Sequence, residues 1–173
     1  MAPCISCSAA REVRRERRVE FHIEIERKYL LSGLPLMPPA KDVLEIDQGY
    51  IPGKRLVERL RREVRRDGKV RYYRTVKAGR GLERIELEDE TDERTFVHLW
   101  QLTDGRRLRK RRYKVAHGDD VWEIDQFVDR DLVLAELELP DADHPIAVPE
   151  WLAPVLVREV TGEREYANSN LAH

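Results

Sequence analysis

Charged side chains recur at every second position in several short stretches of this 173-residue sequence. The clearest stretch reads IEIERK and contains Glu24, Glu26 and Lys28 in alternating positions. A second stretch, near the end of the chain, places Glu136 and Glu138 within the apolar run LVLAELEL. Carboxylate oxygens are ligands that Mg²⁺ and Mn²⁺ prefer, whereas ammonium and guanidinium groups neutralise phosphate oxygens. A site that combines both kinds of group could bind a divalent metal together with a phosphate-rich ligand.

Alternation of this kind is typical of a β-strand with one buried face. The pattern returns along the chain, and Asp67-Gly68 between two such segments is a strong hairpin signal. Consecutive strands joined by short turns close naturally into a barrel, because closure removes exposed edges. The sequence therefore predicts an α+β fold, mainly antiparallel β, built on an eight-stranded closed barrel with flanking helices. The predicted strands cover residues 20–30, 48–51, 56–66, 69–77, 82–90, 107–116, 119–127 and 132–139.

The remaining segments are predicted to flank this barrel. A short helix is expected after a proline-rich turn, between residues 33 and 47. Residues 91–102 repeat apolar side chains at helical spacing, with Thr91 as the candidate N-cap. The C-terminal part is predicted to contain a short helix (149–154), a strand (155–160) and a polar helix (around 163–171).

Each long predicted strand carries its charged residues on one face. Antiparallel sheets ordinarily turn such faces toward water. Two features argue against that interpretation here: the carboxylates of LVLAELEL lie in an apolar run, and Ser, Thr, Asn and Gln are scarce among the charged residues. If these faces line the barrel, its interior must be wet and hold a charged ligand, because a dry interior could not tolerate these charges. The inward set would be Glu24, Glu26, Lys28, Arg59, Arg61, Tyr73, Thr75, Lys77, Arg84, Glu86, Glu88, Lys110, Arg112, Glu123, Asp125, Glu136 and Glu138.

Bulk composition limits the other possibilities. Lys and Arg number 32 against 33 Asp and Glu, and this balance argues against a nucleic-acid partner. No stretch approaches 18 apolar residues and no secretory signal pattern is present, so we expect no membrane partner and a cytoplasmic location. The only cysteines, Cys4 and Cys7, lie in a segment 1–18 that we expect to be a disordered or extended leader. Residues 19–173 are expected to form a single domain.

The motifs and their order resemble the CYTH superfamily, the triphosphate tunnel metalloenzymes. EIERK (24–28) is similar to the ExExK signature of that superfamily. The resemblance covers nearly everything from Val19 onward, and it implies an eight-stranded tunnel that binds a linear triphosphate, in a monomer or homodimer. The other matching motifs are QGY (48–50), RLR (59–61), TVK (75–77), RIELE (84–88), KRRY (110–113), WEIDQF (122–127), LAELEL (134–139) and EVTGEREYANSNLA (159–172).

The resemblance also implies roles for individual residues. The hairpin before TVK is longer than usual, so Arg65 could take part of the role assigned to Arg61. Catalytic roles are implied for Glu24, Glu26, Lys28, Glu136 and Glu138. Metal ligands for Mg²⁺ or Mn²⁺ would be Glu24, Glu26, Asp125, Glu136 and Glu138, and phosphate-binding residues would be Lys28, Arg59, Arg61, Lys77, Arg84, Lys110 and Arg112.

Within the superfamily, the WEID motif and a C-terminal helix able to plug one tunnel mouth resemble the inorganic tripolyphosphatases most. We therefore expect metal-dependent hydrolysis of inorganic triphosphate or a related linear triphosphate. A class IV-type adenylyl cyclase, which makes cyclic AMP from ATP, is the alternative within the superfamily. A module that binds polyphosphate or nucleotide without turnover is the alternative from another class.

Overall fold

The computed structural model describes residues 22–53, 56–78 and 83–172, although the side chains of residues 22–24, 77–78 and 83–86 are outside the described part. The predicted leader at residues 1–18, with both cysteines, therefore lies outside the described residues. Within them, no helix has the length and apolar character needed to cross a membrane.

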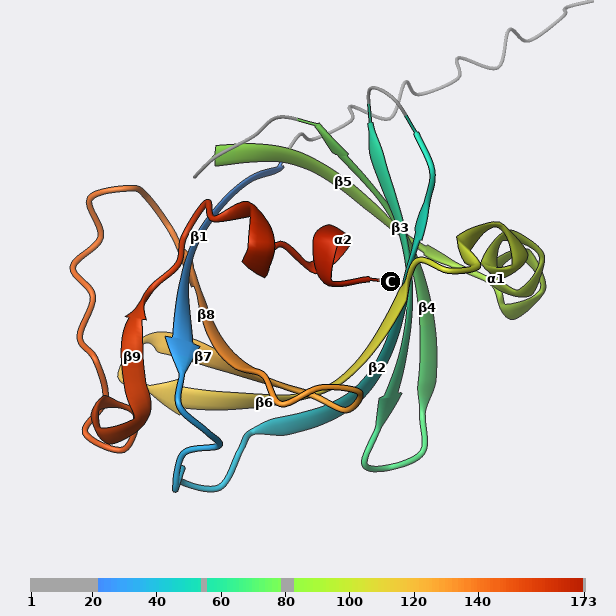
Figure 1. The fold of residues 1–173 in the computed structure, drawn as a ribbon. Coiled ribbons are helices and arrows are strands. Elements are labelled where there is room, and N and C mark those ends of the chain that lie inside the picture. Colours follow the sequence, from blue (N-terminus) through green and yellow to red (C-terminus); the bar gives the residue numbers. More distant parts are fainter. Residues whose placement is uncertain (1–21, 54–55, 79–82, 173) are drawn as a thin grey trace, which may run out of the picture.

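Antiparallel strands curve around a central space, as Figure 1 shows. The sheet order is β5-β4-β3-β2-β6-β7-β8-β1-β9, and β1 pairs additionally with β5. The described strands are β1 (His22–Leu31), β2 (Asp42–Ile51), β3 (Val57–Arg65), β4 (Val70–Ala78), β5 (Glu83–Thr91), β6 (Arg107–His117), β7 (Asp120–Phe127), β8 (Val133–Leu139) and β9 (Leu156–Glu159).

The first strand joins the two ends of this series. Seven residue pairs connect β1 to β8, from Ile25↔Leu139 to Leu31↔Val133. Among the described residues, four pairs, from His22↔Glu86 to Ile25↔Glu83, connect β1 to β5. The predicted eight-stranded closed barrel is corrected in two respects: the described part of the chain forms nine strands, and within it a continuous hydrogen-bonded ladder does not close the sheet. Both differences arise at β1, which divides its pairing between β5 and β8 and adds β9 as a further neighbour.

The helix predicted between residues 33 and 47 is wrong. Residues from Asp42 onward belong to the ten-residue strand β2, which pairs with β3 and β6 along nearly its whole length. Leu44 and Ile46 are buried while Glu45 is exposed, so the segment has the period of a strand. The ladders with β3 and β6 provide hydrogen bonds to the backbone on both edges of β2. These hydrogen bonds outweigh any local helical preference.

The helix predicted at residues 91–102 is confirmed as α1 (Glu93–Trp100), followed by the 3₁₀ turn η1 (Gln101–Thr103). Its N-cap is Asp92, not Thr91, since the Asp92 carboxylate accepts hydrogen bonds from the Thr95 backbone N–H at 2.9 Å and from its hydroxyl. The predicted helix at 149–154 is reduced to the 3₁₀ turn η2 (Ala153–Val155). The predicted C-terminal helix is divided into η3 (Arg164–Tyr166) and α2 (Asn168–Leu171).

The main hydrophobic core lies on the outer face of β1, β7 and β8. It contains Tyr29, Trp122 and Leu137, and Leu152 from the C-terminal part of the chain packs against them. A second apolar cluster lies inside the ring, where the C-terminal residues meet Tyr50 and the neighbouring inner side chains. Figure 1 shows α2 within the space that the strands enclose. Because the larger core is outside, the opposite faces of β1, β7 and β8 turn their charged residues inward.

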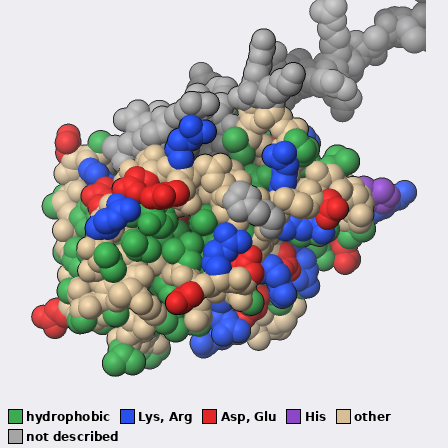
Figure 2. All heavy atoms as spheres, in the orientation of Figure 1, with side chains coloured by type: hydrophobic (Ala, Val, Ile, Leu, Met, Phe, Trp, Pro, Cys, Tyr) green, Lys and Arg blue, Asp and Glu red, His purple; other side chains and the backbone are tan. Residues whose placement is uncertain are grey.

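Charged residues on the outer face also pair across strands. Asp47 on β2 accepts hydrogen bonds at 2.9 Å from both Arg62 on β3 and Arg109 on β6. Arg111 pairs with Glu45 in the same way at 2.5 Å. Figure 2 shows acidic and basic side chains interspersed on the visible face. This mixing agrees with the small net charge of −1.

Candidate active site

The register of the sheet places the predicted site residues on its inner face. Lys28 lies opposite Glu136, and Arg112 lies opposite Asp125. Across β3, β4 and β5, cross-strand pairs place Arg59, Thr75 and Glu88 in one row. These side chains therefore come from strands on different sides of the ring in Figure 1. The alternation in the sequence predicted this shared face correctly.

The first cluster of charges lies on β1, β6, β7 and β8. Lys28 Nζ is 2.9 Å from Glu136 Oε1, and Arg112 Nη2 donates to Glu136 Oε2 at 2.6 Å. Arg112 also donates from Nε and Nη2 to the two oxygens of Asp125, each at 2.6 Å. Lys110 contacts the same carboxylate. Glu123 contacts Arg112 as well, so three carboxylates surround the three cations in a largely buried network.

Burial and ion pairing shift the pKa values of Glu136 and Lys28 in opposite directions. Burial alone would raise the pKa of Glu136, but the nearby Lys28, Lys110 and Arg112 outweigh it and hold that pKa well below its usual value. Burial would likewise lower the pKa of Lys28, yet Glu136 and Glu26 raise it overall. For Lys110, burial dominates and its pKa is lowered. Glu136 and Lys28 are therefore ionised at neutral pH.

The second cluster lies on β3, β4 and β5. Glu88 accepts hydrogen bonds from Arg59 Nη2 at 2.9 Å and from Arg61 Nη2 at 2.7 Å. Thr75, which is fully buried, donates its hydroxyl to Glu88 at 2.7 Å. Arg61 Nε also lies 3.1 Å from Glu63 Oε1. Both arginines predicted to bind phosphate are therefore fixed by carboxylates of the inner face.

The structure distinguishes Arg61 from Arg65, which share a face of β3. The Arg61 side chain is 15% exposed and belongs to the second cluster. The Arg65 side chain is 41% exposed and lies 3.5 Å from Asp42. Arg61 consequently occupies the inner position, as first assigned.

Two inner residues of the QGY motif received no role from the sequence. Gln48 is buried, and its Nε2 donates to the Tyr50 hydroxyl at 2.5 Å. Burial raises the pKa of Tyr50 to about 12, against the opposing effect of Arg59 and Lys28. The phenol is therefore protonated at neutral pH and lies close to the predicted phosphate-binding cations. The motif was visible in the sequence, but only the register shows that both side chains point inward.

Three predicted site residues can be placed by backbone alone. Glu24 pairs with Arg84 across β1 and β5, and Lys77 pairs with Glu86 across β4 and β5. These backbone pairs lie at and next to the β1–β5 junction. The side chains of Glu24, Lys77 and Arg84 lie outside the described part, so their predicted roles stay predictions.

No model of a known protein family matches the sequence. An inorganic triphosphatase from Acetivibrio thermocellus is 36% identical over 152 residues, which cover 86% of this chain and 92% of that protein. This chain belongs to the inorganic triphosphatase family. A second member, the inorganic triphosphatase of Nitrosomonas europaea, is 34% identical over 157 residues, with 86% of this chain and 96% of that protein covered.

Solved structures agree with membership of the inorganic triphosphatase family. The crystal structure of an inorganic triphosphatase superposes with a TM-score of 0.58 at 30% identity, covering 86% of this chain and 93% of the other. A conserved hypothetical protein from Pyrococcus furiosus, at 18% identity, covers 69% of this chain and 80% of its own, with a TM-score of 0.51, and shows the fold alone. The resemblance drawn from the motifs is thereby confirmed.

The sequence of this triphosphatase-family chain predicts a bound metal ion. Some of the predicted carboxylate ligands lie where they could bind one. Among the described side chains, no group of three or more His, Cys, Asp or Glu residues is arranged to hold a metal ion. Glu26 and Glu138 lie directly opposite each other on β1 and β8. Two like charges in such positions repel. Lys28 Nζ lies 3.7 Å from Glu26 Oε1, and a divalent cation bound by both carboxylates would reduce their repulsion further. Their hard oxygens are the type that Mg²⁺ and Mn²⁺ prefer.

Asp125 and Glu136, also predicted as metal ligands, have different surroundings in this triphosphatase-family chain. Both oxygens of Asp125 accept hydrogen bonds from Arg112. Glu136 is held between Lys28 and Arg112. Their partners are cations, so direct coordination of a metal would require these ion pairs to open.

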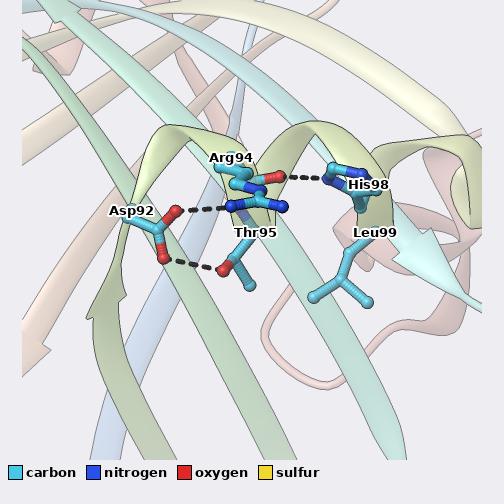
Figure 3. Close-up of a pocket in the computed structure, with 5 residues that line it drawn as sticks. All are labelled: Asp92, Arg94, Thr95, His98 and Leu99. Carbon is cyan, nitrogen blue, oxygen red and sulfur yellow. Dashed lines mark hydrogen bonds between the residues drawn. The ribbon is translucent and has the colours of Figure 1, made fainter.

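A shallow hollow beside α1 is separate from these clusters. Figure 3 shows that Asp92, Arg94, Thr95, His98 and Leu99 line it. Its polar contacts are those of a helix start: Asp92 caps the Thr95 N–H, and His98 Nδ1 lies 2.7 Å from the Arg94 carbonyl oxygen. The hollow lies along α1 from its N-cap onward and is not part of the triphosphatase-family site.

Proposed function

We propose that this chain hydrolyses inorganic triphosphate, or a related linear triphosphate, with the help of a divalent metal, and that the ring of strands acts as the tunnel that binds the substrate. The observation that carries this proposal is the gathering of buried cations on one inner face. The names of both relatives, each an inorganic triphosphatase, support the same substrate. The cations are Lys28, Arg59, Lys110 and Arg112.

Substrate binding would exchange one set of anions for another. Glu88, Asp125 and Glu136 neutralise the inner cations. Breaking such buried pairs without replacement is costly. A linear triphosphate supplies that replacement, because each phosphate presents several oxygens to guanidinium forks and to the Lys28 ammonium.

The carboxylates at the Glu26–Glu138 pair are the proposed metal site. Bound Mg²⁺ or Mn²⁺ would stabilise negative charge on the phosphates and favour ionisation of an attacking water. Glu26 and Glu138 would hold the ion together with the predicted Glu24. Lys28 Nζ, 3.7 Å from Glu26 Oε1, would neutralise the phosphate oxygens next to it.

Two features of this chain would assist the reaction. The protonated Tyr50 hydroxyl accepts a hydrogen bond from Gln48, so its own proton is available for an oxygen of a bound phosphate. The C-terminal residues pack against the inner apolar cluster and would restrict water on that side of the ring. Together they favour a single oriented substrate over a freely hydrated one.

The experiment is a comparison of substrates with the purified chain. Inorganic triphosphate, ATP and thiamine triphosphate would each be incubated with Mg²⁺ or Mn²⁺, and both phosphate and cyclic AMP would be measured. We expect rapid phosphate release from inorganic triphosphate that stops when EDTA is added. Cyclic AMP from ATP would instead support a cyclase, and binding of triphosphate without any product would support a binding module.

A further inference from the structure

Glu88 joins the two arginines of the second cluster through a single carboxylate. Its Oε1 accepts a hydrogen bond from Arg61 Nη2 at 2.7 Å, and its Oε2 accepts one from Arg59 Nη2 at 2.9 Å. The two arginines lie two residues apart on one face of β3. One anionic group therefore lies between two guanidinium groups.

The position of Glu88 is itself fixed. The Thr75 hydroxyl donates to Glu88 Oε2 at 2.7 Å and accepts a hydrogen bond from Arg59 Nη2 at 3.1 Å. Thr75 is fully buried and is the cross-strand partner of both Arg59 and Glu88. A contiguous row across three strands thus fixes the carboxylate relative to the arginines.

The arginines need such an anion between them. Burial lowers the pKa of Arg61, and the neighbouring charge of Arg59 lowers it further, while Glu63 and Glu88 act in the opposite direction. Arg61 also has Glu63 at 3.1 Å, but without the negative charge of Glu88 between them the two guanidinium groups would repel each other more strongly. Since a phosphate group and a carboxylate engage guanidinium forks in similar ways, the spacing that Glu88 maintains also suits a phosphate.

We propose that Glu88 is a positioning residue that holds Arg59 and Arg61 at the spacing required by one phosphate group of the substrate, and that it releases them when the substrate binds. This inference rests on the proposed function only for the identity of the substrate. Glu88 itself would not touch the reacting atoms.

The test is Glu88→Gln, which keeps the shape of the side chain but removes its charge. Loss of the bridge frees the arginines to separate, so we expect the KM for inorganic triphosphate to rise about tenfold. The Mg²⁺ concentration that gives half-maximal activity should not change. The matched control is Asp89→Asn, which removes one charge from the neighbouring, outward-facing residue of β5 and should leave both parameters unchanged.

The sign of the change in KM decides between positioning and simple competition. If Glu88 only competes with the substrate for the arginines, its neutralisation will lower KM, and the proposal is overturned. If Glu88 is a metal ligand, the Mg²⁺ requirement will rise in Glu88→Gln, which also overturns it. A rise in KM alone supports positioning.

A second comparison asks whether Glu88 acts through Arg61. In an Arg61→Gln background, Glu88→Gln should have a much smaller effect on KM than in the wild type. Equal effects in the two backgrounds would contradict the proposal. Circular dichroism and thermal unfolding of each variant would establish that the fold is retained.

Binding of tripolyphosphate in EDTA, measured by calorimetry, separates this inference from the proposed function. We expect Glu88→Gln to weaken this binding about tenfold even without turnover. If the wild type binds but does not hydrolyse triphosphate, the proposed function fails while the role of Glu88 can still be measured. If binding is equal or tighter in Glu88→Gln, the role of Glu88 fails whatever the enzyme assay shows.

Discussion

At the scale of single residues, the inner carboxylates contribute to stability as well as to the proposed chemistry. Glu136 accepts charge-assisted contacts from Lys28 and Arg112 and has an 8% exposed side chain. Removing one partner of a buried ion pair leaves the other charges uncompensated, and this is strongly destabilising. Glu138, two residues further along the same face of β8, is exposed. The two glutamates should therefore differ in their effect on folding.

We expect Glu136→Gln to reduce the free energy of unfolding by about 2–4 kcal/mol, because Lys28 loses its nearest carboxylate and Arg112 loses one of its carboxylate contacts. Glu138→Gln serves as the matched control and should change the free energy of unfolding by less than about 1 kcal/mol. Urea denaturation measures both variants. Equal losses of stability would contradict the burial argument, and a reduced Mg²⁺ affinity in Glu138→Gln alone would support its proposed metal role.

The same ion pairs predict a pH dependence of stability. The pKa of Glu136 in the folded chain lies well below 4.5, so its stabilising contribution is complete above that value and is lost as the pH falls through the folded pKa. The difference in free energy of unfolding between the wild type and Glu136→Gln should be constant near neutral pH and shrink in acid. Urea titrations over a pH series measure it. A difference that grows below pH 4.5 would mean that the pKa is raised instead.

The sequence predicted the face on which each charged residue lies, but not its partners. Alternation alone places Glu136, Asp125 and Arg112 on one side of their strands. Which cation meets which carboxylate depends on the register and tilt of strands far apart in the chain, and no local pattern contains that information. The bridge from Glu88 to Arg59 and Arg61 was invisible for this reason.

At the scale of elements, the strand β2 explains the largest error of the sequence analysis. The segment follows a proline-rich turn and contains a glycine, so its sequence predicts a strand only at residues 48–51. Its partners β3 and β6 decide its conformation through two long ladders. Tertiary packing explains why a glycine occupies position 49. A Cβ there would lie 2.6 Å from Thr103 Oγ1 and 2.9 Å from the Trp100 ring. The α1–η1 segment can approach β2 closely only because that Cβ is absent.

We expect Gly49→Ala to reduce the free energy of unfolding by about 1–3 kcal/mol, since Thr103 and Trp100 must move away from β2. Gly33→Ala is the control, because a Cβ at Gly33 meets nothing within 4 Å. That control should stay within about 0.5 kcal/mol of the wild type. Chemical denaturation measures both, and indistinguishable stabilities would mean that α1 adjusts without cost.

At the scale of the whole molecule, the protein has its larger apolar core outside the ring and a smaller one inside. The inner cluster joins Tyr50, Leu108, Phe127 and Leu134 to Val160 and Ala172. The last turn of the chain therefore covers part of the interior that the charged residues do not occupy. The family resemblance predicted a helix able to plug one mouth, and Figure 1 shows α2 within the ring.

The contribution of this C-terminal packing can be measured with Ala172→Asp. Ala172 is buried in the inner apolar cluster, and an aspartate there would place a carboxylate among apolar side chains. A cost of about 2–3 kcal/mol corresponds to a fall in Tm of roughly 5–10 °C for a chain of this size. Glu165→Gln, at an exposed site, is the control and should leave Tm within about 2 °C. An unchanged Tm in Ala172→Asp would show that the C-terminal residues do not hold the ring together.

The division of β1 between two partners has a consequence for the order of folding. The pairs β3–β4, β4–β5, β6–β7 and β7–β8 join neighbours in the chain, whereas β2–β6, β1–β8 and β1–β5 join distant segments. Local hairpins form before contacts that require the closure of long loops. The strand β1 emerges early during synthesis, yet both of its main partners must exist before it can settle between them. Its short junction with β5 should be the last to become protected in pulsed hydrogen exchange and the first to open.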